Sequence, residues 1–577
     1  MKRMSQYAPA MGVLALCFFN PWGFAALPDL GLIVIGLFAT ATLAIAVRRG
    51  SLFVDKTLLL LGVAIAAGLI ASLASDAPLM SIFGGLTRSS GVVSMVVWFV
   101  AFWAGLQFNG DAIDRDRQLV LFGRAAAVFA LLVVLGRLGI PVVPSPDSAR
   151  ATGPLGSSAF SGSVLALTTP LCVINLFHQK MRERSEGFVL LGIQVMALIA
   201  TGARASWLAA FIGAVISLVV MVKRRNDVNE RSADFRQVAV GLVAVLFIGV
   251  FSLFAFDSTS RITNVGEENG TAAGRLVLWE TGLRAVSHDP IFGVGFDQQE
   301  SAIAESLPSD FEKRFDDSVI PDRAHNWFID LWLGGGILTV IAMLLAFVVA
   351  LRRSQRDLLG RAIQIGVIGY LLQAQFNFSL PGVEAAVWLL LGVAIAPQSR
   401  RVKLAIQPVV PIALVGVLLV APFALNIVAD TQLERGQTAE LSGNLVHAQD
   451  LYESASSMAS WQPALEEVVA RFGMRNGDAA LAQASAVEAT VRSGGQLRWR
   501  ELQGQTLLAS GEYATARDVY QSLIEERPTD SSLYVGLGIA HIGLADEGAA
   551  MVAFNTALQI NPNSEQAQAG LAQIPKP

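Results

Sequence analysis

The sequence predicts an all-α protein, in which a polytopic bundle of about 12–13 transmembrane helices precedes a C-terminal α-solenoid. Two observations predict the bundle. Of the 577 residues, 53% are hydrophobic and only 15% are charged, and the mean hydropathy is +0.53. The apolar residues gather in stretches of roughly 20, the length that one helix needs to cross a bilayer. A third observation, a repeat with a period of 34 residues after residue 428, predicts the solenoid.

The predicted spans follow one another up to residue 428. Their approximate centres are residues 15, 38, 66, 98, 130, 168, 194, 214, 246, 338, 368, 388 and 417. Lys2 and Arg3 ahead of the first apolar stretch are also typical of a signal peptide, but a second stretch, Leu32–Val47, follows at once. We therefore expect an uncleaved first span, a membrane domain over residues 1–428 and a soluble domain over residues 429–577.

Positively charged residues predict the orientation of the bundle, because Lys and Arg accumulate in cytoplasmic loops. With a cytoplasmic N-terminus and alternating spans, every basic cluster falls on the cytoplasmic side. These clusters are Arg48 and Arg49, Arg115 and Arg117, Lys180 to Arg184, Lys223 to Arg225, Arg352 to Arg356, and Arg400 to Lys403. One long loop, residues 257–325 with 13 acidic and 6 basic residues, then lies on the periplasmic or extracellular face together with the soluble domain.

The long outer loop contains two local patterns. Arg275–Leu283 has the apolar spacing of a short amphipathic helix, and Asp289–Gly295 contains the Pro and Gly residues of a turn. At the end of the loop, His325 and Asn326 stand directly before the apolar run that begins at Trp327. A neutral imidazole at this boundary can take a proton from a hydroxyl near neutral pH. The alternative is a hydrogen-bonded structural histidine, with Asp322, Arg323 and Asn326 as neighbours.

Three short outer connections carry an arginine in special surroundings. Glycines frame Arg88 and follow Arg150, and Arg204 lies between two spans that almost touch. Glycine permits close backbone approach and a guanidinium matches phosphate oxygens, so these arginines suit a lipid-linked phosphate or diphosphate. For Arg88 and Arg150 the alternative is a side chain that reaches from a span end to the interface. Arg204 is expected near the membrane interior, where a charged residue usually has a function, so a functional role is the stronger interpretation for it.

The soluble domain repeats small residues and aromatic residues at fixed positions. The aligned sets are Gly443, Gly477, Gly511 and Ala545; Ala448, Ala482, Ala516 and Ala550; and Tyr452, Ala486, Tyr520 and Phe554. This pattern of helix pairs resembles tetratricopeptide repeats. Such repeats bind a protein partner or an extended peptide in a concave groove, although a spacer is an equal alternative.

Several classes of site are not expected. The net charge of −4 argues against a nucleic-acid partner. The cysteines, Cys17 and Cys172, lie in apolar runs and support neither a disulfide framework nor a zinc site. The acidic stretch Asp310–Asp317 lacks a recognisable ligand spacing, and no glycine loop of the nucleotide-hydrolase type occurs. We therefore expect no metal and no cofactor.

Taken in order, these segments resemble the O-antigen ligase family of membrane glycosyltransferases. The family includes O-antigen ligases, related O-antigen polymerases and protein O-oligosaccharyltransferases. The segments that carry the resemblance are the glycine-framed Arg88, Arg150–Gly156, Thr201–Trp207, Gly274–Trp279, Pro290–Gly295, Ala324–Asn326 and Gly334–Gly336. The resemblance implies a GT-C-like bundle in the cytoplasmic (inner) membrane.

The resemblance also implies an activity and roles for residues. The family transfers a glycan from undecaprenyl diphosphate to a hydroxyl of a glycan, lipid or protein acceptor, outside the cytoplasmic membrane and without metal or nucleotide. Arg204 and Arg275 would bind the diphosphate and stabilise the departing charge, and His325 would act as the base. The remaining candidates, Arg88, Arg150, Arg323 and Asn326, would contact substrate. Ala203 stands where family ligases often carry serine, but the adjacent charge is retained.

Alternative functions remain open at this stage. A polymerase would share the donor site and differ only in its acceptor. A membrane scaffold that displays repeats predicts that Arg204, Arg275 and His325 tolerate alanine. A transporter would usually carry charged residues in mid-span, whereas these spans are largely uncharged at their centres. A peptidoglycan polymerase of the shape and division type also has many spans, but the His-Asn pair and the repeats argue against it.

Overall fold

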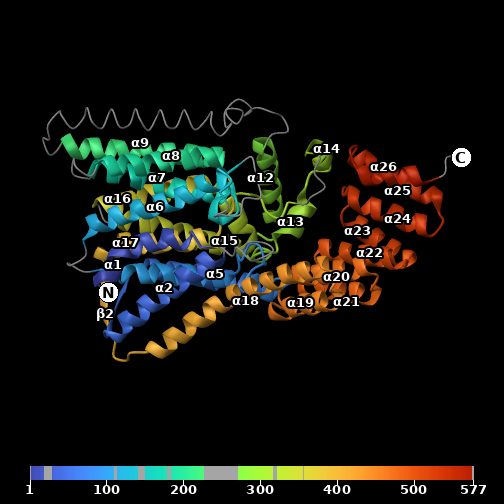
Figure 1. Cartoon of the computed structure of the whole chain (residues 1–577), viewed down its shortest axis with the longest axis horizontal. Helices are drawn as coiled ribbons and strands as arrows, with labels where there is room; N and C mark the ends of the chain where they lie inside the picture. The colour runs from blue at the N-terminus through green and yellow to red at the C-terminus, as the bar shows by residue number, and fades with distance from the viewer. Residues whose placement is uncertain are drawn as a thin grey trace. The chain divides into compact units, whose positions relative to one another are not determined.

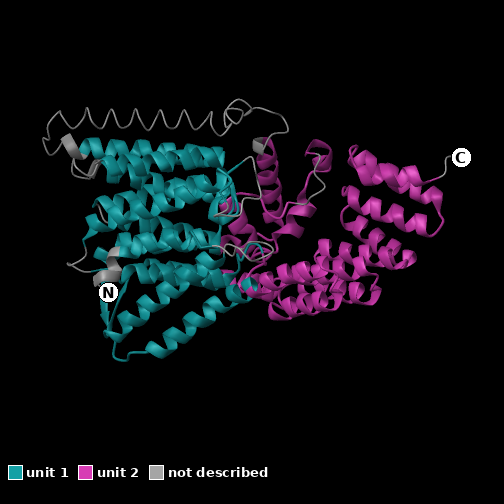
Figure 2. Cartoon of the chain, viewed as in Figure 1, with its two compact units in different colours: residues 1–66, 87–265, 339–427 teal, residues 67–86, 266–338, 428–577 magenta. Residues whose placement is uncertain are grey.

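A computed structural model of the chain shows a helical protein with one small sheet (Figure 1). It describes residues 2–18, 29–109, 114–140, 150–178, 184–226, 271–315, 321–354 and 357–574. The chain forms two compact units, each built from three stretches that are separate in the sequence (Figure 2). The first unit comprises residues 1–66, 87–265 and 339–427, and the second comprises residues 67–86, 266–338 and 428–577. The loop between the ninth and tenth predicted spans thus belongs with the repeats.

The first unit contains most of the apolar helices. Its elements are α1 (Lys2–Ala15), α2 (Asp29–Arg48), β1 (Ser51–Val54), α5 (Val92–Leu106), α6 (Arg115–Arg137), η1 (Gly153–Leu155), α7 (Ser158–His178), α8 (Arg184–Thr201), α9 (Arg204–Asn226), α16 (Leu358–Ala374), α17 (Pro381–Ile395), η3 (Ala396–Gln398) and β2 (Arg400–Lys403). Three helices pass from one unit into the other: α3 (Thr57–Ala74), α15 (Trp327–Arg353) and α18 (Val409–Leu441). The predicted domain boundary at residues 428 and 429 falls inside α18 and stays a prediction.

The core of the first unit is α17, in which every residue is buried. It crosses α5 where two glycines meet. A Cβ atom at Gly105 would lie 2.4 Å from the carbonyl oxygen of Leu389, and one at Gly392 would lie 2.2 Å from that of Phe102. Any larger residue would force the two backbones apart, and close packing of small residues is how membrane helices approach one another. The paired strands β1 and β2 run antiparallel, with Ser51 opposite Lys403.

Hydropathy and length agree with a multi-pass membrane protein. Eight helices in the described residues are long and apolar enough to cross a membrane, and Val92–Leu106, Ser185–Thr201 and Leu358–Ala374 are shorter apolar helices. The span predicted near residue 246 lies outside the described residues. The all-α fold is therefore confirmed, while the count of about 12–13 spans stays a prediction.

The second unit contains the outer loop and the repeats. Its elements are α4 (Pro78–Phe83), α12 (Thr271–His288), α13 (Gln299–Ser306), α14 (Phe311–Phe315), α19 (Leu445–Met458), α20 (Pro463–Asn476), α21 (Ala479–Arg492), α22 (Leu497–Ser510), α23 (Tyr513–Glu526), α24 (Ser531–Gly543), α25 (Glu547–Ile560) and α26 (Glu565–Gln573). The predicted loop helix is confirmed as part of α12, and the predicted turn is closed by a bond from Gly293 N to Asp289 O of 3.1 Å.

The repeat helices pack as their sequence pattern predicts. The four aligned alanines are buried, and each aromatic side chain fills a gap left by a glycine. A Cβ atom at Gly504 would lie 2.9 Å from the ring of Tyr520, and one at Gly538 would lie 2.6 Å from that of Phe554. The helix turns use a left-handed residue at the same repeat position each time, as at Gly477 and Gly511.

Candidate functional site

In the first unit, the segments of Arg150 and Arg204 lie against each other. The amide of Ala151 donates to the carbonyl oxygen of Ala200 over 3.0 Å. The stem of Arg150 passes over Gly202, because a Cβ atom at Gly202 would lie 3.4 Å from both Cγ and Cδ of the arginine. Gly202 is left-handed, with φ of 61°, and forms the turn that sets Arg204 at the start of α9. Both arginines are half-buried.

The segment of Arg88 joins the same unit through aromatic side chains. The guanidinium of Arg88 lies 4.4 Å from the centre of the Phe378 ring, a cation–π contact. Phe378 in turn packs edge-on against Phe160, with ring centres 5.1 Å apart. The residue after Phe160, Ser161, donates to the carbonyl oxygen of Thr152 over 2.6 Å. A continuous set of contacts therefore leads from Arg88 to the segment that follows Arg150.

Ser89, the neighbour of Arg88, is buried in an unusual conformation. Its φ is 51°, in the left-handed region, and its hydroxyl donates to Oδ2 of Asp29 over 2.8 Å. Ser94 donates to the carbonyl oxygen of Ser89 from the next turn. These bonds hold the backbone beside Arg88 in one strained shape.

In the second unit, α12 places Arg275 on the face that packs against the His325 segment. A Cβ atom at Gly282 would lie 2.8 Å from Cβ of Ala324 and 2.7 Å from Cγ2 of Ile329. Arg275 stands seven residues earlier, two helical turns along the same face, at roughly 1.5 Å per residue. The side chain of Arg275 is half-buried. Helix α12 thus directs Arg275 along the side of the outer loop that carries the histidine.

His325 occupies the position directly before the N-cap residue of α15. Asn326 is the cap of α15, because its Oδ1 accepts from the amides of Phe328 at 3.0 Å and Ile329 at 3.2 Å. His325 has φ of 53°, again in the left-handed region, and is half-buried between Ala324 and Asn326, which are buried. The predicted substrate contact at Asn326 stays a prediction, and the structure gives this side chain a capping task in addition.

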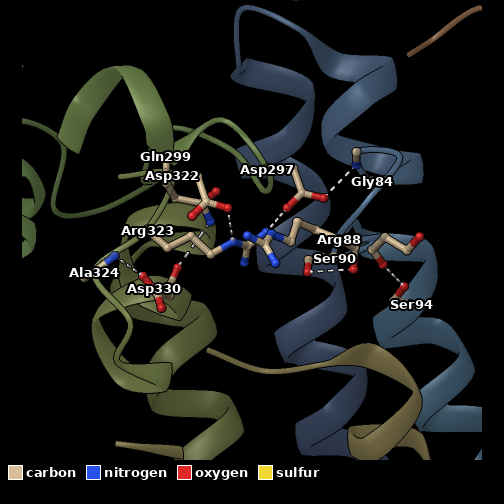
Figure 3. A network of polar contacts seen from close by, with 12 residues as sticks. Gly84, Arg88, Ser90, Ser94, Asp297, Gln299, Asp322, Arg323, Ala324 and Asp330 are labelled. Atoms are coloured by element: carbon tan, nitrogen blue, oxygen red, sulfur yellow. Dashed lines mark hydrogen bonds and ion pairs between the residues drawn. The ribbon is translucent and has the colours of Figure 1, made fainter. Parts of the chain in front are cut away.

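A single carboxylate holds the backbone on both sides of His325. Asp330, in the first turn of α15, accepts from the amide of Ala324 at Oδ1 over 2.8 Å and from the amide of Asn326 at Oδ2 over 3.1 Å. The bond to Ala324 appears in Figure 3. Only 5% of Asp330 is exposed.

Arg323 is buried and paired with Asp297 (Figure 3). Asp297 is left-handed, with φ of 57°, and its other oxygen accepts from the amide of Gly85 over 2.7 Å. Burial lowers the pKa of Arg323, but the charges of Asp297, Asp322 and Asp330 outweigh this effect and raise it above its ordinary value. Arg323 therefore stays charged, and its pairing links the Gly85 turn to the histidine segment.

Left-handed residues other than glycine gather around these groups. Among the described residues only four non-glycine residues have a positive φ: Ser89, Asp297, His325 and Ala545. Three of them adjoin or contact predicted site residues, and the fourth lies in the last repeat turn. Because such conformations cost free energy and are frequent at functional sites, they mark the Ser89 segment of the first unit and the Asp297 and His325 segments of the second unit as candidate functional segments.

The glycines after the histidine serve a break in α15. Gly336 has φ of 71° and ψ of 174°, which interrupts the helix. The amide of Val294 donates to the carbonyl oxygen of Leu333 over 2.7 Å, and the amide of Ile337 donates to that of Pro290 over 3.1 Å. The turn Pro290–Gly295 therefore replaces the lost helical bond and satisfies both freed groups, as an interrupted membrane helix requires.

The repeats attach to the outer segments through positions that recur in the solenoid. Gln462 and Gln496, 34 residues apart, stand directly before α20 and α22. Their side chains donate to Gly84 O over 2.9 Å and to Gln298 Oε1 over 2.7 Å, respectively. In the following repeat, Ser531 at the start of α24 donates to the carboxylate of Glu312 through its amide and through its hydroxyl. The ring of Phe83 packs on Trp461, with centres 5.0 Å apart. The repeat domain is thus docked on the outer segments along one edge.

The structure adds three acidic residues to the predicted site. Asp29 accepts from the Ser89 side chain beside Arg88, Asp297 pairs with the Arg323 side chain, and Asp330 holds the backbone on both sides of His325. None of the three was a sequence candidate. For Asp330 a signal existed, since a carboxylate inside an apolar run needs a partner. For Asp29 and Asp297 the contacts join segments far apart in sequence. In the first unit, contacts connect the segments of Arg88, Arg150 and Arg204. In the second unit, Arg323, His325 and Asn326 lie in one turn, and Arg275 lies on the helix that packs against it. Asp316 and Asp317 lie outside the described residues.

This geometry defines a class: a multi-pass membrane protein with a strained histidine at the end of a long loop and a helical repeat domain docked on that loop. Two parts of the chain match known protein families. Residues 187–344 match the O-antigen ligase family model, and residues 507–574 match a tetratricopeptide repeat model. These matches confirm the predicted resemblance of the membrane part to O-antigen ligases and of the C-terminal part to tetratricopeptide repeat proteins.

Two relatives are similar to just under half of this chain at low identity. A ComP-specific O-oligosaccharyltransferase of Acinetobacter baylyi is 24% identical over 274 residues, which cover 46% of this chain and 48% of that protein. The chain thus spans about half the length of this relative. An uncharacterized protein of Haemophilus influenzae is 23% identical over 290 residues, covering 44% of this chain and 69% of that protein.

Solved structures add repeat proteins to the comparison. YrrB, described as a tetratricopeptide repeat protein with an unusual peptide-binding site, covers 27% of this chain and 80% of its own at 16% identity, with a TM-score of 0.22. Yeast Tom70 covers 80% of this chain and 84% of its own at 12% identity, with a TM-score of 0.23. Scores this low carry no weight for a shared fold.

Proposed function

We propose that the protein is a glycosyltransferase that moves a glycan from undecaprenyl diphosphate to an acceptor hydroxyl, without a metal ion. The observation that carries this proposal is His325, left-handed and half-buried at the start of α15, inside the segment that matches the O-antigen ligase family. A general base must be accessible to its substrate and held in one orientation. His325 meets the second condition through its backbone and the first through its partial exposure.

The proposed reaction is a displacement at the anomeric carbon. His325 takes the proton of the acceptor hydroxyl, the hydroxyl oxygen bonds to the anomeric carbon, and the bond from that carbon to the diphosphate oxygen breaks. The configuration inverts, and undecaprenyl diphosphate leaves as an anion. Arg204 and Arg275 bind the diphosphate and stabilise the charge that it gains. Arg88, Arg150, Arg323 and Asn326 contact the substrates or hold the groups that do.

The membrane location follows from the same function. The donor lipid resides in the cytoplasmic membrane, and the basic clusters of the sequence favour a cytoplasmic N-terminus. The long loop and the repeats are then on the periplasmic or extracellular face, where the glycan is transferred.

A protein acceptor is the second candidate within this function. It is favoured by the similarity to an O-oligosaccharyltransferase and by repeats that are docked on the outer segments. A glycan acceptor, as in a ligase or polymerase, is the first, because the matched family is the O-antigen ligase family. In either case the repeats are a surface for a protein partner.

Alanine substitution in a host that lacks the native gene tests the function. With His325→Ala present in the membrane at the native level, the lipid-linked glycan should accumulate and the transferred product should disappear. The missing product identifies the acceptor class: lipid-bound polymer, surface polysaccharide or glycosylated protein. Arg117→Ala, a cation on the opposite predicted face, serves as a control that keeps transfer. Normal transfer by His325→Ala would show that the histidine is structural.

A further inference from the structure

We infer that Asp330 is a positioning residue that fixes the orientation of His325 by clamping the backbone on either side of it. The inference rests on the proposed function of His325. It concerns a residue that touches neither donor nor acceptor. The carboxylate of Asp330 accepts hydrogen bonds from two main-chain amides, those of Ala324 and Asn326, and its charge also acts on the buried Arg323.

The geometry shows why one carboxylate suffices. When a residue adopts the left-handed conformation, the amides before and after it can converge and form a small anion-binding concavity. His325 has φ of 53°, and the amides of its two neighbours lie 2.8 and 3.1 Å from the two oxygens of Asp330. The anion in this concavity is part of the chain itself. Without it, two buried amides would lose their partner, and His325 would return to a right-handed or extended shape.

The rest of the segment keeps the clamp in place. Asn326 caps α15 through its own side chain, so Asp330 is not needed to start the helix. Ala324 and Ile329 pack into the cluster with Ala285, Val286 and Ile303, which fixes the two ends of the turn. The position of Asp330 in the first helical turn also suits its negative charge. The hydrogen bonds of the carboxylate therefore act on the conformation of one residue, His325.

Kinetics separate positioning from proton chemistry. A misplacement of about 1 Å in a reacting group costs roughly 10²-fold in rate. We expect Asp330→Ala to lower kcat by about this factor with little change in KM for the donor, because no substrate contact is lost. Asp330→Asn keeps one acceptor oxygen and should lose less. The pH at which transfer is half-maximal should stay at its native value in Asp330→Asn. A shift of that pH would mean that Asp330 exchanges protons itself, which overturns a positioning role.

A double-mutant cycle tests the clamp without measuring activity. Glycine adopts the left-handed conformation without strain, so His325→Gly should raise the melting temperature of the purified protein while Asp330 is present. In the Asp330→Ala background the strain is already released, and the same glycine should give no gain. An equal gain in both backgrounds overturns the inference. Asp114→Ala, which removes the side-chain cap of α6 and its bond to Arg117 N, controls for the loss of a helix cap elsewhere.

The two claims fail in different ways. If His325→Ala transfers glycan normally, the proposed function fails, and the melting-temperature cycle still decides whether Asp330 clamps the turn. If His325→Ala is inactive but Asp330→Ala has native kcat, only the positioning role fails. Loss of kcat in Asp330→Ala, partial recovery in Asp330→Asn and coupling in the cycle together support it.

Discussion

His325 and Ala545 adopt the same rare backbone conformation for different reasons. Their φ values are 53° and 57°, and neither is a glycine. Ala545 stands at the position where three other repeats have a left-handed glycine, namely Gly443, Gly477 and Gly511. Its strain is incidental, since the repeat turn forms with either residue. The strain at His325 is sustained by the Asp330 carboxylate and by buried neighbours, so under the proposed function strain accompanies function where the surrounding structure enforces it.

The largest expected effect comes from replacing His325 by glycine. Transfer should fall by about 10²–10⁴-fold, because general-base catalysis contributes this much. The fold should not weaken, since glycine accepts the left-handed shape. Transfer rate and thermal unfolding of the same purified sample measure the two effects. Loss of both activity and stability would make His325 a structural residue like any other.

Removing the carboxylate of Asp297 should have the next largest effect. Asp297→Gly keeps the left-handed conformation but leaves Arg323 buried without its main partner, which costs about 3–5 kcal/mol. Denaturation in detergent would show the loss as a lower unfolding midpoint. Asp297→Asn, which keeps the shape of the side chain, should lose less. If Asp297→Gly is as stable as the native protein, strain relief rather than the ion pair governs this position.

Ala545→Gly should produce a smaller effect of opposite sign. Relief of the left-handed alanine should stabilise the repeat turn by about 1 kcal/mol. Transfer should stay at the native rate, because the turn holds no site residue. Thermal unfolding of the full chain and a transfer assay measure both. A drop in transfer would show that strain in the repeats also serves the reaction, which breaks the contrast with His325.

The smallest expected effect is a pH dependence of stability, caused by Glu312 and its hydrogen bonds to Ser531 in the repeats. Burial raises the pKa of Glu312 above its ordinary value, although the bonds from Ser531 partly oppose this. Ionisation is therefore less favourable in the folded state than in the unfolded one. The free energy of unfolding should fall as pH rises from the ordinary pKa through the raised one, and Glu312→Gln should abolish this dependence.

Limited proteolysis of the native protein and of Glu312→Gln across pH 4–8 gives the measurement. Glu305→Gln, at an exposed position of the nearby helix α13, is the matched control. If native and Glu312→Gln proteins respond to pH in the same way, Glu312 does not govern docking of the repeats.

Patterns within short stretches of sequence predicted much of this molecule. Apolar runs predicted the membrane helices, and the 34-residue period predicted helix pairs whose aromatic residues fill the gaps beside glycine. Boundary chemistry alone singled out His325, and closely spaced spans singled out Arg204. These features depend on neighbours within a turn or a repeat, which is why they are visible without a structure.

Contacts between distant segments explain what was missed. Asp297 binds the amide of Gly85, 212 residues away, and so links two outer segments. The insertion of Pro290–Gly295 into the break at Gly336 likewise depends on two backbones meeting. Asp330 is the exception, since it lies four residues after Asn326. Its task could not be inferred because the left-handed conformation of His325 has no sequence signature, histidine being only moderately favoured there.

Chemical rescue tests the central claim, that the His325 imidazole is the base, most directly. His325→Gly keeps the backbone shape and leaves space for a small base, so transfer from lipid-linked glycan would be measured with and without added imidazole. The account predicts that the variant is inactive alone and that imidazole restores transfer in proportion to its unprotonated fraction, while Asp330→Ala gains nothing. A variant that transfers without imidazole, or one that imidazole leaves inactive at every concentration, would contradict it.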